Sequence, residues 1–483
     1  MIELTDWLKR RRTKIVATLG PASASEEVIA ELIRAGADLF RLNMSHGTHD
    51  QHRATFAAVR KVSAEIGKEV AILADLCGPK IRVGKFEEGS IELEVDEEVT
   101  VTTAEVIGKS GLIPCQYEAL ARDAEEGDRV LLDDGRLELE VLGGDDVELR
   151  CRVKVGGTLK ERKGMHLPGV AVSAPALTEK DHVDARFALE LPVDYFALSF
   201  VRRPEDLEPL RAIISEAGQS TPIISKIEKP EALENIQGIL ATSDGIMVAR
   251  GDLGVELPPE QVPIAQQQLI DAARKHSLPV IVATQMLESM IESSTPTRAE
   301  VSDVANAVLA GTDAVMLSAE TAAGRYPVEA VQVMDRVARQ TESYLWQGDK
   351  FGALGEQDEE ADGDTLLGLA IARSTAQLSR DLHVRAIGVF SHTGRSVREV
   401  SSSRPAAPVL ALSDDPSSHR RLCLLWGVLP QLIDAREAAR PEDSLRWRAA
   451  QMGLTDIGQN LLLVRGFHPD PEQSEPSITV LRA

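Results

Sequence analysis

The sequence predicts an α/β protein whose main part is a (β/α)8 TIM barrel, with a small β-barrel domain inserted into it and a C-terminal α/β domain after it. Three observations predict this fold class. Short β-branched apolar segments alternate with helical patterns as far as residue 317. About a hundred residues separate the third segment from the fourth, far more than a loop needs. An acidic, glycine-containing stretch after residue 346 then precedes a second series of strands and helices.

Eight segments are predicted as barrel strands, because each is short and apolar and is followed by a helical pattern. In the first helix, for example, the sequence predicts a capping box from Ser23 to Glu26 and an end at Gly36. The predicted strands are residues 14–19, 38–42, 70–76, 193–200, 223–227, 245–249, 280–283 and 314–317.

The insertion is predicted to span residues 79–176, so that barrel domain A comprises residues 1–78 and 177–346. Alternating apolar and polar residues at 91–95, 137–141 and 147–155 predict its β-barrel. Residues 347–483 form the predicted C-terminal α/β domain. Its expected strands lie near residues 386–390, 409–412, 461–464 and 478–481.

Charge and composition exclude several classes of function. The chain carries 76 acidic and 53 basic residues, and its net charge of −23 disfavours a general affinity for nucleic acid or for an anionic membrane. No apolar stretch is long enough for a signal peptide or a membrane helix, and the four cysteines include no C-x-x-C pair. These features predict a cytoplasmic protein. The basic segment KRRRTK near the N-terminus is predicted to be solvated.

Reactive side chains collect at the ends of six of the eight predicted strands. The active site of such a barrel lies at the carboxyl ends of its strands, and buried charges there are costly unless they pair or bind a ligand. In chain order, these residues are Arg41, Asn43, Ser45, His46, Asp75, Lys226, Glu228, Arg250, Gly251, Asp252, Thr284, Gln285, Ser318 and Glu320.

Glu228 and Asp252 are the candidate metal ligands, since two carboxylates on adjacent strands, with room for substrate and water, suit magnesium. The alternative is a structural ion pair with Lys226 or Arg250. Lys226 faces the same way as Glu228, because alternate residues of a strand share a face. A lysine beside a metal and an arginine is suited to hold a transferring phosphoryl group or a developing enolate.

Phosphate recognition would need an unusual solution, because neither G-x-x-x-x-G-K-[ST] nor G-x-G-x-x-G occurs. Gly251 opens a turn whose N–H groups could hold a carboxylate or phosphate, or it merely satisfies the turn. His46, His49 and His52 recur at steps of three. Solvated or capping histidines are favoured over a zinc site there.

A series of long motifs, in order and over essentially the whole chain, resembles the pyruvate kinase family. They are TKIVATLGPAS, RLNMSHG, GPKIR, LTEKD, SKIEK, MVARGDLGVE, ATQMLESM, PTRAEVSDVANAVLAGTDAVMLSAETAAGRYP and SHTGRS. The resemblance implies a barrel A domain, an inserted B domain that acts as a lid, and a C-terminal regulatory domain. It also implies a phosphotransferase of the last step of glycolysis, which converts phosphoenolpyruvate and ADP to pyruvate and ATP. The family is usually homotetrameric.

The same resemblance implies roles for the strand-end residues. Arg41 would grip the phosphoryl group, and Lys226 would stabilise charge on it and on the enolate oxygen. Glu228 and Asp252 would hold the divalent ion, Mg²⁺ or Mn²⁺. The backbone of Gly251 and Asp252 would bind the substrate carboxylate.

Thr284 would also bind the carboxylate, and Thr284 and Ser318 are the implied candidates for delivering a proton to the methylene carbon through water. Lid closure would exclude water from the phosphoryl donor. The implied nucleotide-binding residues are Asn43, Ser45, His46, Arg82 and Lys163.

One departure from the family pattern concerns potassium. Members that depend on potassium read Thr-Lys-Gly-Pro-Glu after the third-strand aspartate, where this chain reads LCGPK from Leu76 to Lys80. Asn43, Ser45 and Asp75 remain as potential potassium ligands. We predict that the Lys80 ammonium supplies the charge that potassium would give, so that turnover does not require potassium. The alternative is a Lys80 that pairs with an acidic lid residue.

The SHTGRS segment resembles the family's allosteric sugar-phosphate site, with Ser391, Thr393, Gly394, Arg395 and Ser396 as the candidate phosphate ligands before a helix expected near residue 397. The segment 466–471 lacks the glycine-rich loop of members activated by fructose bisphosphate. Acidic residues from 470 to 475 would repel a second phosphate, which favours a monophosphate effector such as a sugar phosphate or AMP. These residues are Asp470, Glu472 and Glu475.

Two other functions compete with this interpretation. A phosphoenolpyruvate mutase, dikinase or aldolase would share the barrel and the Glu/Asp pair but would lack the inserted lid and the RLNMSHG and MLSAETA motifs. A catalytically silent metabolite sensor would be expected to lose Lys226, Glu228, Asp252 or Thr284, and all four are present.

Overall fold

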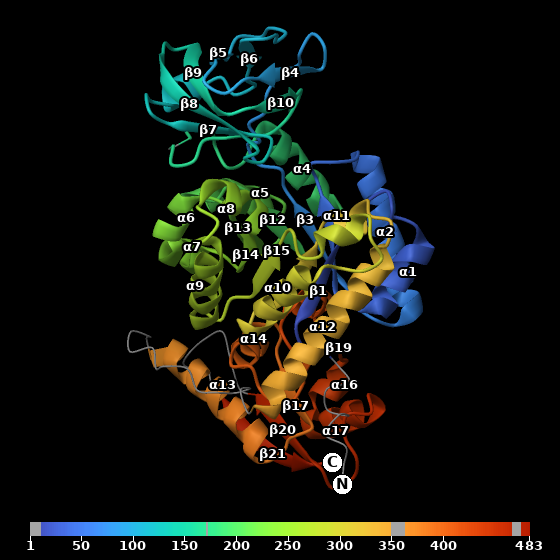
Figure 1. Ribbon diagram of the computed structural model, residues 1–483. Coiled ribbons are helices and arrows are strands. Elements are labelled where there is room, and N and C mark those ends of the chain that lie inside the picture. Colours follow the sequence, from blue (N-terminus) through green and yellow to red (C-terminus); the bar gives the residue numbers. More distant parts are fainter. Residues whose placement is uncertain (1–10, 171, 349–362, 466–474) are drawn as a thin grey trace.

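The computed structural model describes residues 11–170, 172–348, 363–465 and 475–483 (Figure 1). Eight parallel strands close into a barrel in the order β1-β16-β15-β14-β13-β12-β3-β2, which confirms the predicted fold class. Their bounds are Lys14–Leu19 (β1), Leu39–Asn43 (β2), Ala71–Asp75 (β3), Tyr195–Leu198 (β12), Ile223–Ile227 (β13), Gly245–Ala249 (β14), Val280–Ala283 (β15) and Ala314–Leu317 (β16).

Helices surround this barrel and pack their apolar faces on its strands. The α-helices are Glu26–Ala35 (α1), His49–Ile66 (α2), Glu179–Glu190 (α4), Glu208–Glu216 (α5), Pro230–Glu234 (α6), Ile236–Thr242 (α7), Arg250–Glu256 (α8), Val262–Lys275 (α9), Arg298–Leu309 (α10), Ala319–Ala322 (α11) and Pro327–Gln347 (α12). Short 3-10 helices cover Pro204–Leu207 and Glu288–Ile291. None of the described helices is long and apolar enough to cross a membrane.

The start of α1 corrects a detail of the sequence prediction. Its cap is Ser25, whose hydroxyl accepts a hydrogen bond from the N–H of Val28, whereas the Ser23 hydroxyl is buried and accepts from the N–H of Gly20. The predicted capping box was therefore wrong by two residues. The predicted end is confirmed, because Gly36 follows the helix at a positive φ of 126°.

The inserted domain lies beyond the carboxyl ends of the barrel strands (Figure 1). One hydrophobic cluster with members from Ile81 to Ala174 fills it, between a six-stranded sheet in the order β11-β7-β8-β9-β5-β6 and the pair β10-β4. The elements are Ser90–Leu93 (β4), Glu98–Thr102 (β5), Leu112–Pro114 (β6), Leu120–Asp123 (α3), Arg129–Leu132 (β7), Leu137–Gly144 (β8), Glu148–Val155 (β9), Gly157–Lys160 (β10) and Met165–His166 (β11).

The C-terminal domain lies at the opposite end of the barrel and contains a sheet in the order β19-β18-β17-β20-β21 (Figure 1). The sequence prediction missed β19, an edge strand interrupted by Pro430, where the missing N–H disrupts no inner ladder. The elements are Gly363–Asp381 (α13), Ala386–Phe390 (β17), Arg395–Ser402 (α14), Val409–Ser413 (β18), Pro416–Arg421 (α15), Leu422–Leu424 (3-10), Val428–Leu432 (β19), Ala435–Ala438 (α16), Pro441–Gln451 (α17), Asn460–Arg465 (β20) and Ser477–Arg482 (β21).

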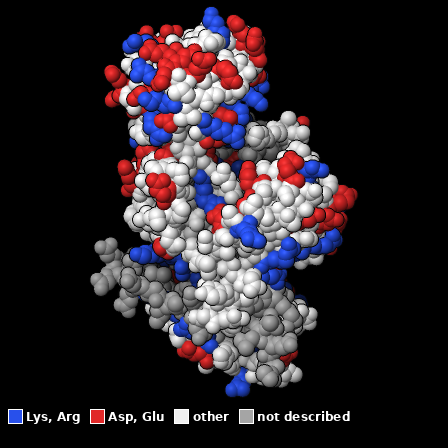
Figure 2. Space-filling view, viewed as in Figure 1, with Lys and Arg blue, Asp and Glu red and all other residues white. Residues whose placement is uncertain are grey.

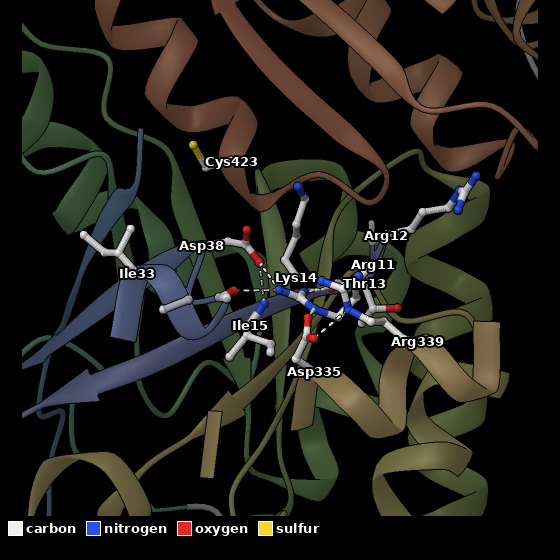
Figure 3. Close-up of polar contacts among 12 residues, drawn as sticks. Arg11, Arg12, Thr13, Lys14, Ile15, Ile33, Asp38, Asp335, Arg339 and Cys423 are labelled. Atoms are coloured by element: carbon white, nitrogen blue, oxygen red, sulfur yellow. Dashed lines mark hydrogen bonds and ion pairs between the residues drawn. The ribbon is translucent and has the colours of Figure 1, made fainter. Parts of the chain in front are cut away.

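The basic segment near the N-terminus joins these domains, and its predicted solvation was wrong for the described residues. Arg11 donates to Asp38 and Asp335, each at 2.9 Å, and its side chain is only 5% exposed (Figure 3). The buried Lys14 ammonium donates to the carbonyl oxygen of Val428, 2.7 Å away in the C-terminal domain. Such burial is tolerated because each charge has a partner. Residues 9 and 10 lie outside the described part of the chain.

The C-terminal domain also covers the end of the barrel that lies opposite the inserted domain. Cys423 and Leu424 pack with Val16, Leu39 and Tyr195 in one buried cluster. Barrel and C-terminal domain therefore share a core as well as a surface. A shift of Cys423 or Leu424 would thus displace side chains of the barrel strands directly.

Candidate active site

Lys226, near the carboxyl end of β13, lies at the centre of a buried group of charges. Its ammonium is 2.8 Å from a carboxylate oxygen of Glu228 and 3.4 Å from one of Asp75, and it donates to the Ser199 hydroxyl at 2.7 Å. Burial alone would lower the pKa of Lys226, but the two carboxylates outweigh burial and raise it. Lys226 is therefore held as an ammonium.

Arg41, on β2, shares Asp75 with Lys226. The guanidinium Nε donates to Asp75 at 2.6 Å, and a terminal nitrogen donates to the Thr18 hydroxyl at 3.3 Å. Burial would raise the pKa of Asp75, but Lys226 and Arg41 hold it below its usual range. One buried carboxylate thus orients two cations, whose remaining N–H groups can bind an anion.

Glu228 and Asp252 are close enough to influence each other. Burial and the charge of Asp252 raise the pKa of Glu228, although one carboxylate oxygen pairs with Lys226 and the other accepts from the N–H of Phe200 at 2.9 Å. The structural ion pair considered for Glu228 is therefore present. The corresponding pair for Asp252 is absent within the described chain, where Arg250 pairs with Asp303 at 2.6 Å.

A divalent cation fits this pair of carboxylates. Their hard oxygen atoms suit such an ion, and its charge would offset the burial and the repulsion from Asp252 that together raise the pKa of Glu228. The described residues contain no group of three or more histidine, cysteine or acidic side chains that could hold a metal ion by themselves. The remaining ligands would therefore be substrate and water, which leaves coordination positions open for chemistry.

Thr284, at the end of β15, has a strained backbone beside Gly251. Its φ is 68°, a left-handed conformation that is unfavourable for a β-branched residue, and Arg250 donates to its carbonyl oxygen at 2.7 Å. The Thr284 hydroxyl accepts from the N–H of Gly251 at 2.7 Å. A hydroxyl and a backbone N–H are thereby placed together at the metal-site edge of the barrel.

Ser318 follows the adjacent strand β16. Its backbone N–H donates to Glu320 at 2.7 Å, while its buried hydroxyl oxygen has no hydrogen-bond partner in the described structure. An orphaned hydroxyl is costly unless water or a ligand satisfies it. Ser318 is thus available for a water that lies between the ends of these strands.

A group of basic side chains lies where the inserted domain meets the barrel. Burial and the charges of Lys80, Arg41 and Arg82 lower the pKa of His46. Figure 2 shows Lys and Arg gathered along this rim, although the whole chain is acidic. Polyanionic ligands therefore meet a local positive field at this rim.

The other residues implied to bind the nucleotide lie in two different domains. Asn43, the last residue of β2, accepts from the N–H of Ser45 at 3.1 Å, and Ser45 lies in the loop that follows. Arg82 donates to the carbonyl oxygen of Arg162, within the inserted domain. Lys163 pairs at 2.6 Å with Asp133 of the same domain, and no described contact joins it to the barrel site.

The histidine series has structural partners. His49 pairs with Asp184 at 2.8 Å and stacks on Phe187, and His52 bonds to the carbonyl oxygen of His46. The interpretation of capping or solvated histidines is thus favoured over a zinc site. By contrast, Ser199 was not predicted as a site residue, because the fourth strand was predicted to run to residue 200, whereas β12 ends at Leu198.

Fold and site together define a (β/α)8-barrel enzyme that binds an anionic substrate with a divalent cation. Comparison with known proteins then identifies the family. Models described as "Pyruvate kinase, barrel domain" and "Pyruvate kinase, alpha/beta domain" match residues 10–331 and 369–475. The chain belongs to the pyruvate kinase family, and it is a phosphotransferase.

Individual relatives agree over most of their length. "Pyruvate kinase 2" of Synechocystis sp. is 48% identical over 88% of this chain and 71% of its own, and a pyruvate kinase of Mycobacterium intracellulare is 42% identical over 98% of both chains. A crystal structure of a pyruvate kinase from Cryptosporidium parvum has a TM-score of 0.89 at 36% identity, covering 98% of this chain and 97% of that one. Phosphoenolpyruvate and ADP as substrates, and a divalent metal, follow from the family.

Proposed function

We propose that Arg41 and Lys226 bind the phosphoryl group of phosphoenolpyruvate and stabilise its transfer to ADP. The observation that carries this proposal is the buried Asp75 carboxylate, which pairs with both cations and orients them. The phosphoryl group leaves the enol oxygen for a terminal oxygen of ADP, so negative charge develops on the enolate, where the Lys226 ammonium can stabilise it. No bond to protein forms, so positioning and charge supply the catalysis.

The substrate carboxylate would lie against the N–H groups of Gly251 and Asp252 and the Thr284 hydroxyl. Glu228 and Asp252 would hold Mg²⁺ or Mn²⁺, which supplies positive charge to the substrate's oxygen atoms. The short bond between Gly251 and Thr284 supports this arrangement, because a carboxylate oxygen can take over the same N–H. Thr284 and the unpartnered hydroxyl of Ser318 would hold the water that protonates the methylene carbon.

ADP would extend along the basic rim, with its phosphates near Asn43, Ser45, His46 and Arg82. Burial lowers the pKa of His46, and the surrounding cations lower it further. Those cations support this placement, since a polyphosphate would be attracted to the same charges. For Lys163 to bind the nucleotide, its ion pair with Asp133 must break. We expect this to happen when the lid closes and brings Lys163 to the barrel site.

The reaction is tested by measuring pyruvate formed from phosphoenolpyruvate and ADP. We expect pyruvate only when both substrates and Mg²⁺ or Mn²⁺ are present, and a chelator should abolish it. The matched variant Asp252→Asn should raise the metal concentration needed for half-maximal rate by at least about tenfold, since one charged ligand is lost. No pyruvate under any of these conditions, even with phosphorylated effectors, would favour the metabolite sensor instead.

A regulatory site in the C-terminal domain is the second part of the proposal. A cavity of about 540 Å³ is lined by Thr393, Gly394 and Arg395, with Arg398 and Arg421 beside them. Of the other candidates, Ser391 accepts from the N–H of Gly394, and Ser396 is buried in the first turn of α14. Three arginines and a helix N-terminus suit a phosphate.

The same cavity reaches the base of the barrel. Tyr195, Pro222 and Pro279 line it from the amino ends of β12, β13 and β15, opposite the catalytic ends of these strands. A bound effector would therefore contact both domains, which supports allosteric regulation. Residues 466–474, including Asp470 and Glu472, lie outside the described structure, so the argument against a second phosphate stays a sequence prediction.

Calorimetric titration with AMP and with glucose 6-phosphate tests this site. We expect at least one of them to bind, and Arg395→Gln should weaken that binding by at least about tenfold, since a charged phosphate contact is lost. Arg436→Gln, an exposed arginine of the same domain outside the cavity, is the matched control. Equal affinity in Arg395→Gln and wild type, or tighter binding of fructose 1,6-bisphosphate, would contradict the proposal.

Three further expectations rest on the resemblance or on composition and stay predictions. They are a homotetramer, a cytoplasmic location, and the absence of nucleic-acid or membrane partners. The residue limits assigned to the domains also remain a proposal. The inserted core from Ile81 to Ala174 supports the limits of 79 and 176.

A further inference from the structure

A contact between His166 and a buried ion pair joins the inserted domain to the barrel. His166, at the end of β11, places its Nδ1 3.6 Å from a carboxylate oxygen of Glu256, the last residue of α8. The same oxygen is 2.5 Å from the Lys229 ammonium. The side chains of Glu256 and Lys229 are 1% and 6% exposed, and that of His166 is 13% exposed.

These residues adjoin the proposed metal ligands. Lys229 directly follows Glu228, and its ammonium lies 5.3 Å from the centre of the Phe200 ring. The N–H of Phe200 donates to the Glu228 carboxylate at 2.9 Å. Glu256 lies one helical turn after Asp252 in the same short helix. A shift of Glu256 or Lys229 would therefore also displace the carboxylates of Glu228 and Asp252, the proposed metal ligands.

Burial of this charged group is not explained by stability alone. A buried ion pair is often no more stable than an apolar pair of the same volume. The second carboxylate oxygen of Glu256 is also buried without a hydrogen-bond partner in the described structure. A group that is costly yet spans two domains is suited to fix their relative position, because its contacts to both domains form together only in one arrangement.

Neighbouring atoms show that the inserted domain rests on α8 at this place. A side-chain carbon built on Gly135, in the turn between β7 and β8, would lie 3.9 Å from Val255, which precedes Glu256. The contact at His166 is thus part of a small docking surface on α8. It is the charged part of that surface.

We propose that His166, Glu256 and Lys229 form a latch that holds the inserted domain over the barrel and positions Glu228 and Asp252. Glu256 is its central positioning residue, since it contacts the lid through His166 and the barrel through Lys229. The proposal rests on the metal and lid roles described above. With the latch made, α8 and the segment after β13 are held together, and the lid stands where it can cover bound ADP. With the latch broken, both the lid and the metal carboxylates gain freedom.

Spin-label distance measurements on the full-length protein without substrates test the latch. One label is placed at Val106→Cys in the inserted domain and the other at Ile264→Cys on α9, both exposed positions. Cys77→Ser removes the half-buried native thiol, whereas the other three cysteines are buried. We expect His166→Asn and Glu256→Gln to broaden the distance distribution, and His276→Asn, at the C-cap of α9, to leave it unchanged.

Kinetics give the second readout. Both latch variants should raise the KM for ADP by at least about tenfold and lower kcat less, because lid placement governs nucleotide binding more than chemistry. A thermal midpoint close to wild type shows that each variant folds, and Glu256→Gln serves where His166→Asn does not. A distance distribution and a KM for ADP that both stay at wild-type values would overturn the latch.

Failure of the latch can be told apart from failure of the proposed metal site. Mn²⁺ binding to Glu228→Gln, followed by electron paramagnetic resonance, tests the metal site alone. Unchanged Mn²⁺ affinity there would remove the metal role, while the label distances would still decide whether His166 and Glu256 fix the inserted domain.

Discussion

Replacing Lys226 with methionine is expected to lower kcat for pyruvate formation by at least about a thousandfold, equivalent to about 4 kcal/mol of transition-state stabilisation. Methionine keeps most of the length of lysine but carries no charge. Asp75 and Glu228 hold the ammonium in its charged form. Among the described residues of the site, Lys226 is the only cation that contacts both Asp75, the partner of Arg41, and Glu228, a proposed metal ligand, and methionine removes it.

The substitution also leaves buried carboxylates with fewer partners, so folding must be measured alongside turnover. Asp75 keeps Arg41, and Glu228 keeps the N–H of Phe200, which should preserve the fold. Lys226→Arg is the matched charged control and should retain more activity than methionine, though less than wild type, because a planar guanidinium is larger than the ammonium that donates to Ser199. A folded Lys226→Met enzyme within about tenfold of wild-type kcat would exclude the assigned role.

The fold was predictable because barrel strands leave strong local signals. β13, β14, β15 and β16 have the predicted bounds, since a polar residue of the candidate site follows the last residue of each strand. The start of α1 was not predictable to the residue, because Ser23 and Ser25 both suit a cap, and only the packing of Ser23 against Gly20 decides between them.

Contacts between residues far apart in the chain could not be predicted from the sequence. The KRRRTK segment has the composition of a solvated run, yet Arg11 is buried because Asp38 and Asp335 converge on it from 27 and 324 residues away. The same holds for His166, Glu256 and Lys229, which lie in three separate segments. Residue types predicted what the strand ends can bind, whereas contacts with the lid and the C-terminal domain required the folded chain.

Lys80→Glu is expected to create a requirement for potassium, whereas the wild-type enzyme is expected to turn over without it. Lys80 is exposed, its charge acts on His46, and it makes no ion pair within the described residues, so the alternative of a pair with an acidic lid residue is not supported. Its ammonium is therefore free to supply positive charge beside the phosphates. Reversing that charge should lower kcat without potassium by at least about tenfold, and added potassium should restore part of it.

The measurement compares pyruvate formation in potassium with that in tetramethylammonium at equal ionic strength. Lys85→Glu is the matched control, because it makes the same charge change at another exposed lysine of the inserted domain and should respond to neither cation. Wild-type activity should be equal in both salts. The proposal that Lys80 replaces potassium would be contradicted if the wild-type enzyme formed pyruvate only with potassium. It would also be contradicted if the activity of Lys80→Glu did not depend on potassium. The kinase activity itself would still stand, because the pairing of Arg41 and Lys226 with Asp75 does not involve the Lys80 side chain.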